Sequence, residues 1–386
     1  MTGDGSVTGV ADKKRLLSID GGGLLGLIPA ECLIRMEEQL NRMTGSELPL
    51  GKRFDLIGGT STGAIIAAGL CLGWPAKQLR DFYQQFGQEI FAKVFLPLQL
   101  WHKYPSGPLE NRLKEKFGAG TTLGDSALLT NLLVVSKNAT LGNIWFFTNN
   151  PKSKFYGINK NLPLWQVVRA STAAPTFFPP QRMAMPDGAG GSNDYEFIDG
   201  GVSTYNNPSF QVFLEATEPS YGLQWLTGAD KLLLLSLGTG YSPMTVPLGK
   251  AADFTLVQWA QFIVEDLLAD ANLQQNVLMH LLGEAPAAAT GTGMREMDAA
   301  GVRDGAPSAT VLDHVNALLG TKKQLTYQRM TIGLTKARLN GLGLSDIDPA
   351  KVSPMDAVDQ MGNMQRIGRA IAEEQVHMER LRAFFV

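Results

Sequence analysis

The pattern of apolar and polar positions predicts two consecutive units, each made of a strand, a glycine-rich turn and a helix. Residues 15–20 form a short apolar run that leads into glycines, and residues 27–43 carry apolar residues at helical spacing. The run at 54–57 leads into a second glycine turn, and residues 64–72 follow with another helical pattern. Such units favour parallel strands, so we expect an α/β fold with a central, mainly parallel sheet flanked by helices.

Helical and strand-like patterns continue along the rest of the chain. Up to residue 240 we expect helices at 76–92, 108–117, 163–174 and 207–216, and strands at 132–136, 144–148, 181–185, 195–198 and 231–237. Further on we expect a helix at 254–282, a strand at 324–334 and a terminal helix at 355–379. Residues 284–310 are rich in Ala, Gly, Thr and Pro with little apolar periodicity, which predicts a flexible loop.

These elements fit one domain better than two. We expect a flexible leader at residues 1–12 and a single α/β domain at 13–386, with a core at about 15–240 and a helical elaboration at 241–386. The leader has no apolar stretch of the secretory type, and the chain has no run of about 18 apolar residues. We therefore expect a cytoplasmic protein.

The balance of charge narrows the range of partners. The chain has 34 Lys and Arg residues against 36 Asp and Glu residues, a formal net charge of −2. It has no overall basic field to hold a nucleic-acid polymer or an anionic membrane, so lipid contact would depend on apolar surface.

Cys32 and Cys71 lie in apolar helical patterns and are expected to be buried free thiols. No Cys/His cluster has metal-site spacing, so we expect no metal.

The second glycine turn contains a candidate nucleophile. The segment from Gly59 to Gly63 has the form G-x-S-x-G between a predicted strand and a predicted helix, which is the context of a nucleophile elbow. The two glycines permit a tight turn that exposes Ser61, and the helix start offers free N–H groups, including that of Thr62. The alternative is that Ser61 or Thr62 only caps the helix, but the strand before it favours a nucleophile.

The first glycine turn has two interpretations. Gly21, Gly23 and Gly26 fit the dinucleotide pattern G-x-G-x-x-G, which also requires an acidic residue at the end of the second strand. That strand instead ends in the glycine and serine turn described above, which argues against a nucleotide site. The other use of Gly21, Gly22 and Gly23 beside a nucleophile is an oxyanion hole, because their N–H groups have no side chains to obstruct them.

Asp199 is the candidate base. It follows the predicted strand at 195–198 and precedes Gly200 and Gly201. An isolated Asp-Gly-Gly is usually a turn. Beside an exposed serine, however, a carboxylate at a strand end is a credible proton acceptor.

These three motifs, in this order, resemble those of the patatin-like phospholipases, whose signatures are D-G-G-G-x-x-G, G-x-S-x-G and D-G-[AG]. Residues 170–179 and 236–240 also resemble segments of that family, so the resemblance covers residues 15–240. One position departs from the pattern, because Leu25 stands where the family usually has Lys or Arg before the last glycine.

The resemblance implies a three-layer patatin-like fold and a lipid acyl hydrolase with a Ser–Asp dyad. Ser61 would be the nucleophile and Asp199 its base, with an oxyanion hole from the amides of residues 21–23 and Thr62. The motif glycines would be Gly26, Gly59, Gly63, Gly200 and Gly201. It implies phospholipid, lysophospholipid or other acyl ester substrates, transient contact with a membrane surface, and no cofactor or metal.

Three other functions remain open. A Ser-His-Asp esterase would need His280, His314 or His377 as its base. A non-catalytic module for lipid or nucleotide binding would not need both Ser61 and Asp199. Some bacterial patatin-like proteins act as membrane-degrading effectors switched on by a cyclic nucleotide, although no motif here points to such a site.

Two segments are candidates for lipid contact. Residues 91–104 are rich in aromatic and apolar residues, with Phe95 and Trp101 as the pair to test, and the long helix from Phe254 is also apolar. For both segments, ordinary core packing is the favoured interpretation. The predicted loop at 284–310 could be either a lid over the site or an unstructured loop.

Overall fold

A computed structural model describes residues 13–91, 102–187, 190–242, 246, 248–286 and 322–386. In these residues nine strands form one sheet, in the order β5-β6-β3-β2-β1-β7-β9-β8, and β4 pairs with the other edge of β3. The strands are β1 (Lys14–Ile19), β2 (Leu56–Thr60), β3 (Asn131–Asn138), β4 (Asn143–Thr148), β5 (Gln181–Pro186), β6 (Ser192–Asp199), β7 (Leu232–Leu237), β8 (Gly283–Glu284) and β9 (Leu325–Met330).

The sheet is mainly parallel, as predicted. Strands β3, β2, β1, β7, β9 and β8 run parallel to one another. Only the pairs β3–β4, β3–β6 and β5–β6 are antiparallel. The carboxyl ends of the parallel strands therefore meet at one edge of the sheet, which is where loops of α/β proteins usually carry a site.

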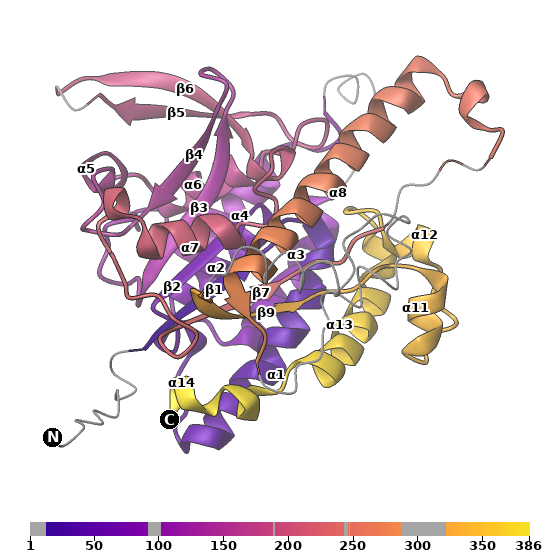
Figure 1. The fold of residues 1–386 in the computed structure, drawn as a ribbon. Helices are drawn as coiled ribbons and strands as arrows, with labels where there is room; N and C mark the ends of the chain where they lie inside the picture. Colours follow the sequence, from indigo (N-terminus) through magenta and orange to yellow (C-terminus); the bar gives the residue numbers. More distant parts are fainter. Residues whose placement is uncertain (1–12, 92–101, 188–189, 243–245, 247, 287–321) are drawn as a thin grey trace, which may run out of the picture.

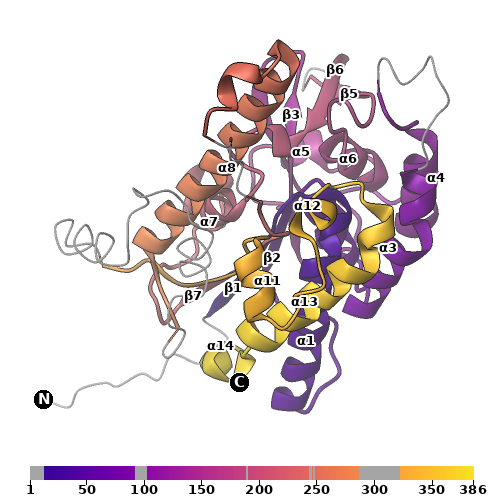
Figure 2. The same cartoon turned by 90° about the vertical axis from the view of Figure 1, so that its right-hand side faces the viewer.

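Helices cover both faces of the sheet and give three layers (Figures 1 and 2). One face packs against α1 (Leu27–Thr44), α2 (Thr62–Cys71), α3 (Ala76–Ile90), α4 (Gly107–Phe117), α6 (Leu164–Ser171) and α13 (Met361–Gln375). The other face packs against α7 (Ser209–Thr217) and α8 (Leu256–Leu282). Four short α-helices are also present: α5 (Tyr156–Asn159), α11 (Lys336–Gly341), α12 (Pro349–Val352) and α14 (Arg382–Phe385).

Alternation along the strands explains the two cores. On β1, Leu17 and Ile19 belong to the larger cluster, while Leu16 belongs to the smaller one with Leu234 and Tyr327. Helix α2 is apolar on all sides and every one of its residues is buried, as expected for a helix inside the core.

Several element boundaries differ from the predicted ones. The second strand runs from Leu56 to Thr60 rather than over 54–57, because Gly58 and Gly59 pair with both β1 and β3 instead of forming a turn. A Cβ at Gly58 would collide with Val212 of α7, so glycine is needed there. The terminal helix starts at Met361 rather than at 355, since the carbonyl of Met355 accepts a hydrogen bond from the Leu24 amide at 2.8 Å. Most of the predicted loop at 284–310 lies outside the described residues.

The C-terminal third does more than add helices. Strand β9 pairs with β7 inside the central sheet, and α13 packs along α1 (Figure 2). The division into a leader and one domain stays a prediction, because residues 1–12 lie outside the described ones.

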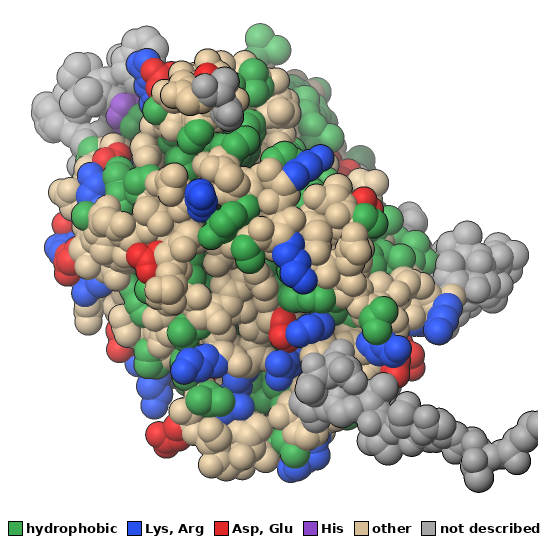
Figure 3. All heavy atoms as spheres, turned by 90° about the vertical axis from the view of Figure 1, so that its left-hand side faces the viewer, with side chains coloured by type: hydrophobic (Ala, Val, Ile, Leu, Met, Phe, Trp, Pro, Cys, Tyr) green, Lys and Arg blue, Asp and Glu red, His purple; other side chains and the backbone are tan. Residues whose placement is uncertain are grey.

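None of the helices in the described ranges is both long and apolar enough to cross a bilayer. On the face shown in Figure 3, Lys and Arg side chains are scattered among apolar and uncharged groups.

The contact between α1 and α13 provides a test of this fold. A Cβ at Gly368 would lie 3.0 Å from Glu31 Cβ and from the Ile28 main chain, whereas a Cβ at Gly362 meets nothing within 4 Å. We expect Gly368→Ala to lower the free energy of unfolding by about 1–3 kcal/mol through overpacking. Gly362→Ala on the same helix should raise it by about 0.5 kcal/mol. Chemical denaturation measures both, and equal effects would contradict the described packing.

Candidate active site

Ser61 lies on a sharp turn between β2, which ends at Thr60, and α2, which begins at Thr62. Its backbone has φ 55° and ψ −121°, a conformation that costs a non-glycine residue on the order of 1–3 kcal/mol. A Cβ at Gly59 would collide with the Gly63 carbonyl, and a Cβ at Gly63 would collide with the Ile19 carbonyl. Both glycines are therefore required by close backbone packing, and the turn has the geometry of a nucleophile elbow.

Strand register brings Asp199 to the serine. On β3, Val135 pairs with Thr60 of β2, and the next residue, Ser136, pairs with Asp199 of β6. Strand β4 occupies the opposite edge of β3, so β2 and β6 follow one another along the same edge. Ser61 comes directly after Thr60, and the ends of these two strands therefore meet.

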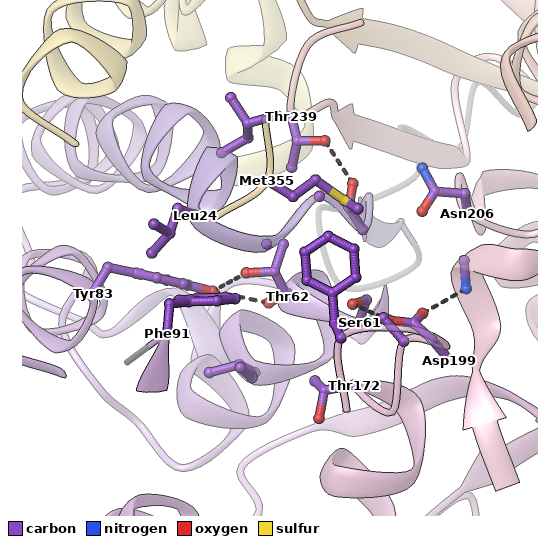
Figure 4. A pocket seen from close by; sticks show the side chains of 18 of the residues that line it. Leu24, Ser61, Thr62, Tyr83, Phe91, Thr172, Asp199, Asn206, Thr239 and Met355 are labelled. Carbon is purple, nitrogen blue, oxygen red and sulfur yellow. Dashed lines mark hydrogen bonds between the residues drawn. The ribbon is translucent and has the colours of Figure 1, made fainter. Parts of the chain in front are cut away.

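The two side chains are hydrogen-bonded (Figure 4). Ser61 Oγ donates to Asp199 Oδ2 at 2.5 Å, and the Gly201 amide donates to Oδ1 at 2.6 Å. Asp199 is 4% exposed, and this burial raises the pKa of its carboxyl to about 6. The bonds from Ser61 and Gly201 and the charge of Arg169 oppose that rise in pKa. The carboxylate is thus ionised at neutral pH but more basic than an exposed aspartate.

The predicted oxyanion donors fall into two groups. The Gly21 amide already donates to the Asn206 carbonyl at 3.1 Å. The amides of Gly22, Gly23 and Thr62 have no acceptor among the described residues. Gly23 has φ 58°, and a Cβ there would lie 2.9 Å from the Met355 Cβ and 2.5 Å from its carbonyl oxygen.

The other motif glycines also stand at close contacts. A Cβ at Gly26 would lie 2.6 Å from Thr62 Oγ1, which is hydrogen-bonded to the Tyr83 hydroxyl. A Cβ at Gly200 would lie 2.5 Å from the Val135 carbonyl oxygen. These glycines let the loops before and after the site approach the sheet and α2.

A cavity of about 300 Å³ opens beside the Ser61 and Asp199 side chains. Its described lining is largely apolar and includes Leu24, Leu25, Ile65, Phe91, Phe178 and Leu268. Among the described residues that line the cavity, Asp199 is the one charged side chain, and none is a Lys, Arg or His. Leu25, where the family pattern has a cation, forms part of this apolar wall.

None of the described histidines, His102, His280 and His377, lines the cavity. His280 is in α8, its ring centre lies 5.2 Å from that of Tyr327, and burial lowers its pKa to about 4. The His377 ring is within hydrogen-bonding distance of the Glu374 carbonyl, at 2.9 Å. His314 lies outside the described residues, as do Phe95 and Trp101.

Sequence reasoning missed several residues that support the site. Ser171 Oγ accepts the Ser61 amide at 2.8 Å and donates to the Val135 carbonyl at 2.5 Å. Thr239 Oγ1 donates to the Gly21 carbonyl at 2.6 Å. Both lie in segments that resemble the family, but that resemblance assigned them no role. No pattern in the sequence pointed to Arg169, which is buried in α6 close enough to influence Asp199.

Comparison with known proteins gives the family. A family model described as patatin-like phospholipase matches residues 17–213, about half of the chain. Patatin-17 of Solanum cardiophyllum is 30% identical over 265 residues, which cover 63% of this chain and 66% of that protein. An intracellular phospholipase A2 of Caenorhabditis elegans is 31% identical over 250 residues, covering 63% of this chain and 21% of that protein.

The chain thus spans less than two thirds of the length of these relatives. Among solved structures, VipD from Legionella pneumophila aligns over 92% of this chain and 67% of its own, with a TM-score of 0.35 and 13% identity. The family assignment rests on the match to the family model, whose residues include both Ser61 and Asp199. The chain belongs to the patatin-like phospholipase family.

Proposed function

We propose that the protein is a lipid acyl hydrolase in which Ser61 is the nucleophile and Asp199 is its base. The observation that carries this proposal is the 2.5 Å hydrogen bond from Ser61 Oγ to a buried carboxylate at an apolar cavity. Membership of the patatin-like phospholipase family supports phospholipids or lysophospholipids as substrates.

The proposed reaction passes through a covalent acyl-enzyme. Asp199 accepts the Ser61 proton as Oγ attacks the ester carbonyl, and then passes that proton to the departing alcohol. A water molecule, deprotonated by the same carboxylate, hydrolyses the acyl-enzyme and restores the serine. The raised pKa of Asp199 suits this role, because a stronger base takes the serine proton more readily.

The amides of Gly22, Gly23 and Thr62 are the proposed oxyanion donors. They have no acceptor among the described residues, and Thr62 also begins α2, whose positive dipole end favours negative charge. Each such donor is worth about 2.7–4 kcal/mol in the transition state. Gly21 supports the loop instead, because its amide is bonded to Asn206.

The cavity wall favours an acyl chain over a charged group. Leu24, Leu25 and Phe91 are among its apolar lining residues, and none of the described lining residues is cationic. Burial of each methylene of a substrate chain would contribute about 0.8 kcal/mol. The head group would then remain near the cavity mouth.

We propose that α8 makes the transient contact with the lipid surface. Leu256, Ile263 and Leu267 recur on one helical face and are 89%, 51% and 62% exposed. On the same helix Leu268 lines the cavity, and Figure 1 shows the amino-terminal end of α8 reaching beyond the sheet. The helix carries Asp266 and Asp270, so we expect zwitterionic rather than anionic surfaces.

Substitutions at the dyad test the proposed chemistry. We expect Ser61→Ala to lower kcat on a p-nitrophenyl ester and on phospholipid vesicles by about 10⁴-fold or more. Asp199→Asn should lower kcat by about 10²–10⁴-fold, because it removes the base. His280→Asn, His314→Asn and His377→Asn serve as controls and should stay within about threefold of wild type. Retained activity in Asp199→Asn together with loss in a histidine variant would instead support a Ser-His-Asp esterase.

The pH dependence of activity tests the base separately. Activity requires ionised Asp199, so kcat/KM should fall about tenfold per unit as pH drops below about 6. A midpoint near 4, the ordinary value for an aspartate, would argue against Asp199 as the buried base.

The same raised pKa predicts a pH-dependent stability. The folded protein binds the Asp199 proton more tightly than the unfolded chain, so folding should lose stability as pH rises from about 4 through about 6. Asp199→Asn removes this loss and should gain about 2–3 kcal/mol relative to wild type between pH 4 and pH 7. Denaturation at both pH values measures this gain, and a constant difference between the two proteins would contradict it.

Charged substitutions on α8 test the lipid contact. Ile263→Asp with Leu267→Asp should lower hydrolysis of phosphatidylcholine vesicles by about tenfold or more, because two apolar anchors are lost. Hydrolysis of a water-soluble p-nitrophenyl ester should change by less than about twofold. Leu141→Asp is the control, since Leu141 is 52% exposed in the turn between β3 and β4. An equal loss on both substrates would reject α8 as the lipid-contacting surface.

A further inference from the structure

A buried ion pair lies behind the glycine loop, outside the mechanism given above. Asp20 directly precedes Gly21, and Arg329 lies on β9, two strands away from β1. Their side chains are 3% and 2% exposed. Arg329 Nη1 donates to Asp20 Oδ1 at 2.8 Å, and Nη2 donates to Oδ2. Neither residue lines the cavity, so this pair does not reach a substrate there.

The sheet fixes the guanidinium in place. Ser18, Ser236 and Arg329 pair across β1, β7 and β9 and form one polar row. Arg329 Nη1 donates to Ser236 Oγ at 2.7 Å, and Ser209 of α7 lies within hydrogen-bonding distance of both serines. The arginine is therefore held from the centre of the sheet as well as by Asp20.

Asp20 in turn fixes the start of the loop. Its amide donates to the Leu237 carbonyl at 3.0 Å, while the carbonyl and the amide of Gly21 bond to Thr239 and Asn206. The next two residues, Gly22 and Gly23, carry the proposed oxyanion donors. On their other side the loop is held by the Leu24 amide, which donates to the Met355 carbonyl at 2.8 Å. Since glycines leave the backbone many conformations, the directions of the two N–H groups depend on both anchors, and Asp20 is the one before them in the chain.

We infer that Arg329 is a positioning residue for the glycine loop at residues 21–23. By donating hydrogen bonds to both carboxylate oxygens of Asp20, it orients the Gly22 and Gly23 amides. Residues 21–26 contain no charged side chain, so the charge that holds Asp20 comes from β9. Arg329 also lies outside residues 17–213, which match the family model. The inference rests on the proposed acyl hydrolase function and adds a residue from the C-terminal third to its site.

Kinetics per active site tests this role. The concentration of active sites is first measured by letting a fluorophosphonate react to completion with the serine. Arg329→Met and Arg329→Lys are then compared with wild type on a p-nitrophenyl ester, with kcat expressed per active site. Displacing a loop by about 1 Å can cost about 10²-fold, so we expect Arg329→Met to lose about that much in kcat with little change in KM. Arg329→Lys keeps the positive charge but cannot donate two parallel hydrogen bonds to the Asp20 carboxylate, so we expect kcat to fall by about tenfold.

A tetrahedral mimic separates positioning from simple loss of stability. Affinity for a trifluoromethyl ketone, which forms an oxyanion on the serine, should weaken by the same factor as kcat/KM. Arg15→Met is the matched control, because Arg15 pairs with Asp55 at 3.1 Å at the other end of β1. It should lower the melting temperature but leave kcat per active site within about twofold of wild type.

A double variant isolates the geometric role from the charge. Asp20→Asn with Arg329→Met removes both buried charges, so we expect the melting temperature to recover in part while kcat per site stays low. Recovery of kcat to within about threefold of wild type would overturn the inference, because charge balance alone would then suffice.

The single variants can overturn the inference as well. The inference fails if Arg329→Met keeps kcat per active site within about threefold of wild type. If Arg329→Met does not fold, the inference fails when Arg329→Lys keeps kcat per active site within that range. An inactive wild type would refute the proposed function and the inference together. An active wild type with an inactive Ser61→Ala and an unaffected Arg329→Met would refute the inference alone.

Discussion

The close backbone packing at the turn of Ser61 is the constraint on which the rest of the site depends. The Gly63 main chain lies directly against the Ile19 carbonyl of β1, and the Gly59 main chain lies against Gly63 itself. The buried α2 and the paired strand β2 hold Ser61 at φ 55° despite the cost of that conformation. The position of the serine is thus set by main chain, and the other groups are arranged around it.

Two buried carboxylates lie near this turn, and their partners give them different capacities. Both oxygens of Asp20 accept hydrogen bonds from the guanidinium of Arg329, and this full charge opposes the rise in pKa that burial causes at the Asp20 carboxyl. The Asp199 carboxylate accepts hydrogen bonds from the Ser61 hydroxyl and the Gly201 amide, the Arg169 charge acts on it without donating a hydrogen bond, and burial raises its pKa to about 6. An aspartate held by dipoles can exchange a proton during a reaction, whereas one held by an ion pair is suited to fixing structure.

The C-terminal third completes the site even though the family match ends at residue 213. Leu268 of α8, Leu334 and Met355 line the cavity, and the Met355 carbonyl also accepts the Leu24 amide. Strand β9 brings Arg329 behind the glycine loop. This region therefore shapes part of the cavity wall and supports the glycine loop.

The sequence alone determined the fold class, most of the elements and the identities of Ser61 and Asp199 as candidates. These depend on local signals: apolar periodicity, glycines between a strand and a helix, and an aspartate at a strand end. The resemblance to the patatin-like phospholipases followed from the same motifs in the same order, and the match to the family model confirmed it.

Only the tertiary structure decided which groups meet. The approach of Asp199 to Ser61 depends on two strands sharing one edge of β3, and the pairing of Arg329 with Asp20 spans 309 residues of chain. The bond that occupies the Gly21 amide comes from a loop far away in sequence. Contacts of this kind depend on strand order and register, which no local pattern of residues encodes.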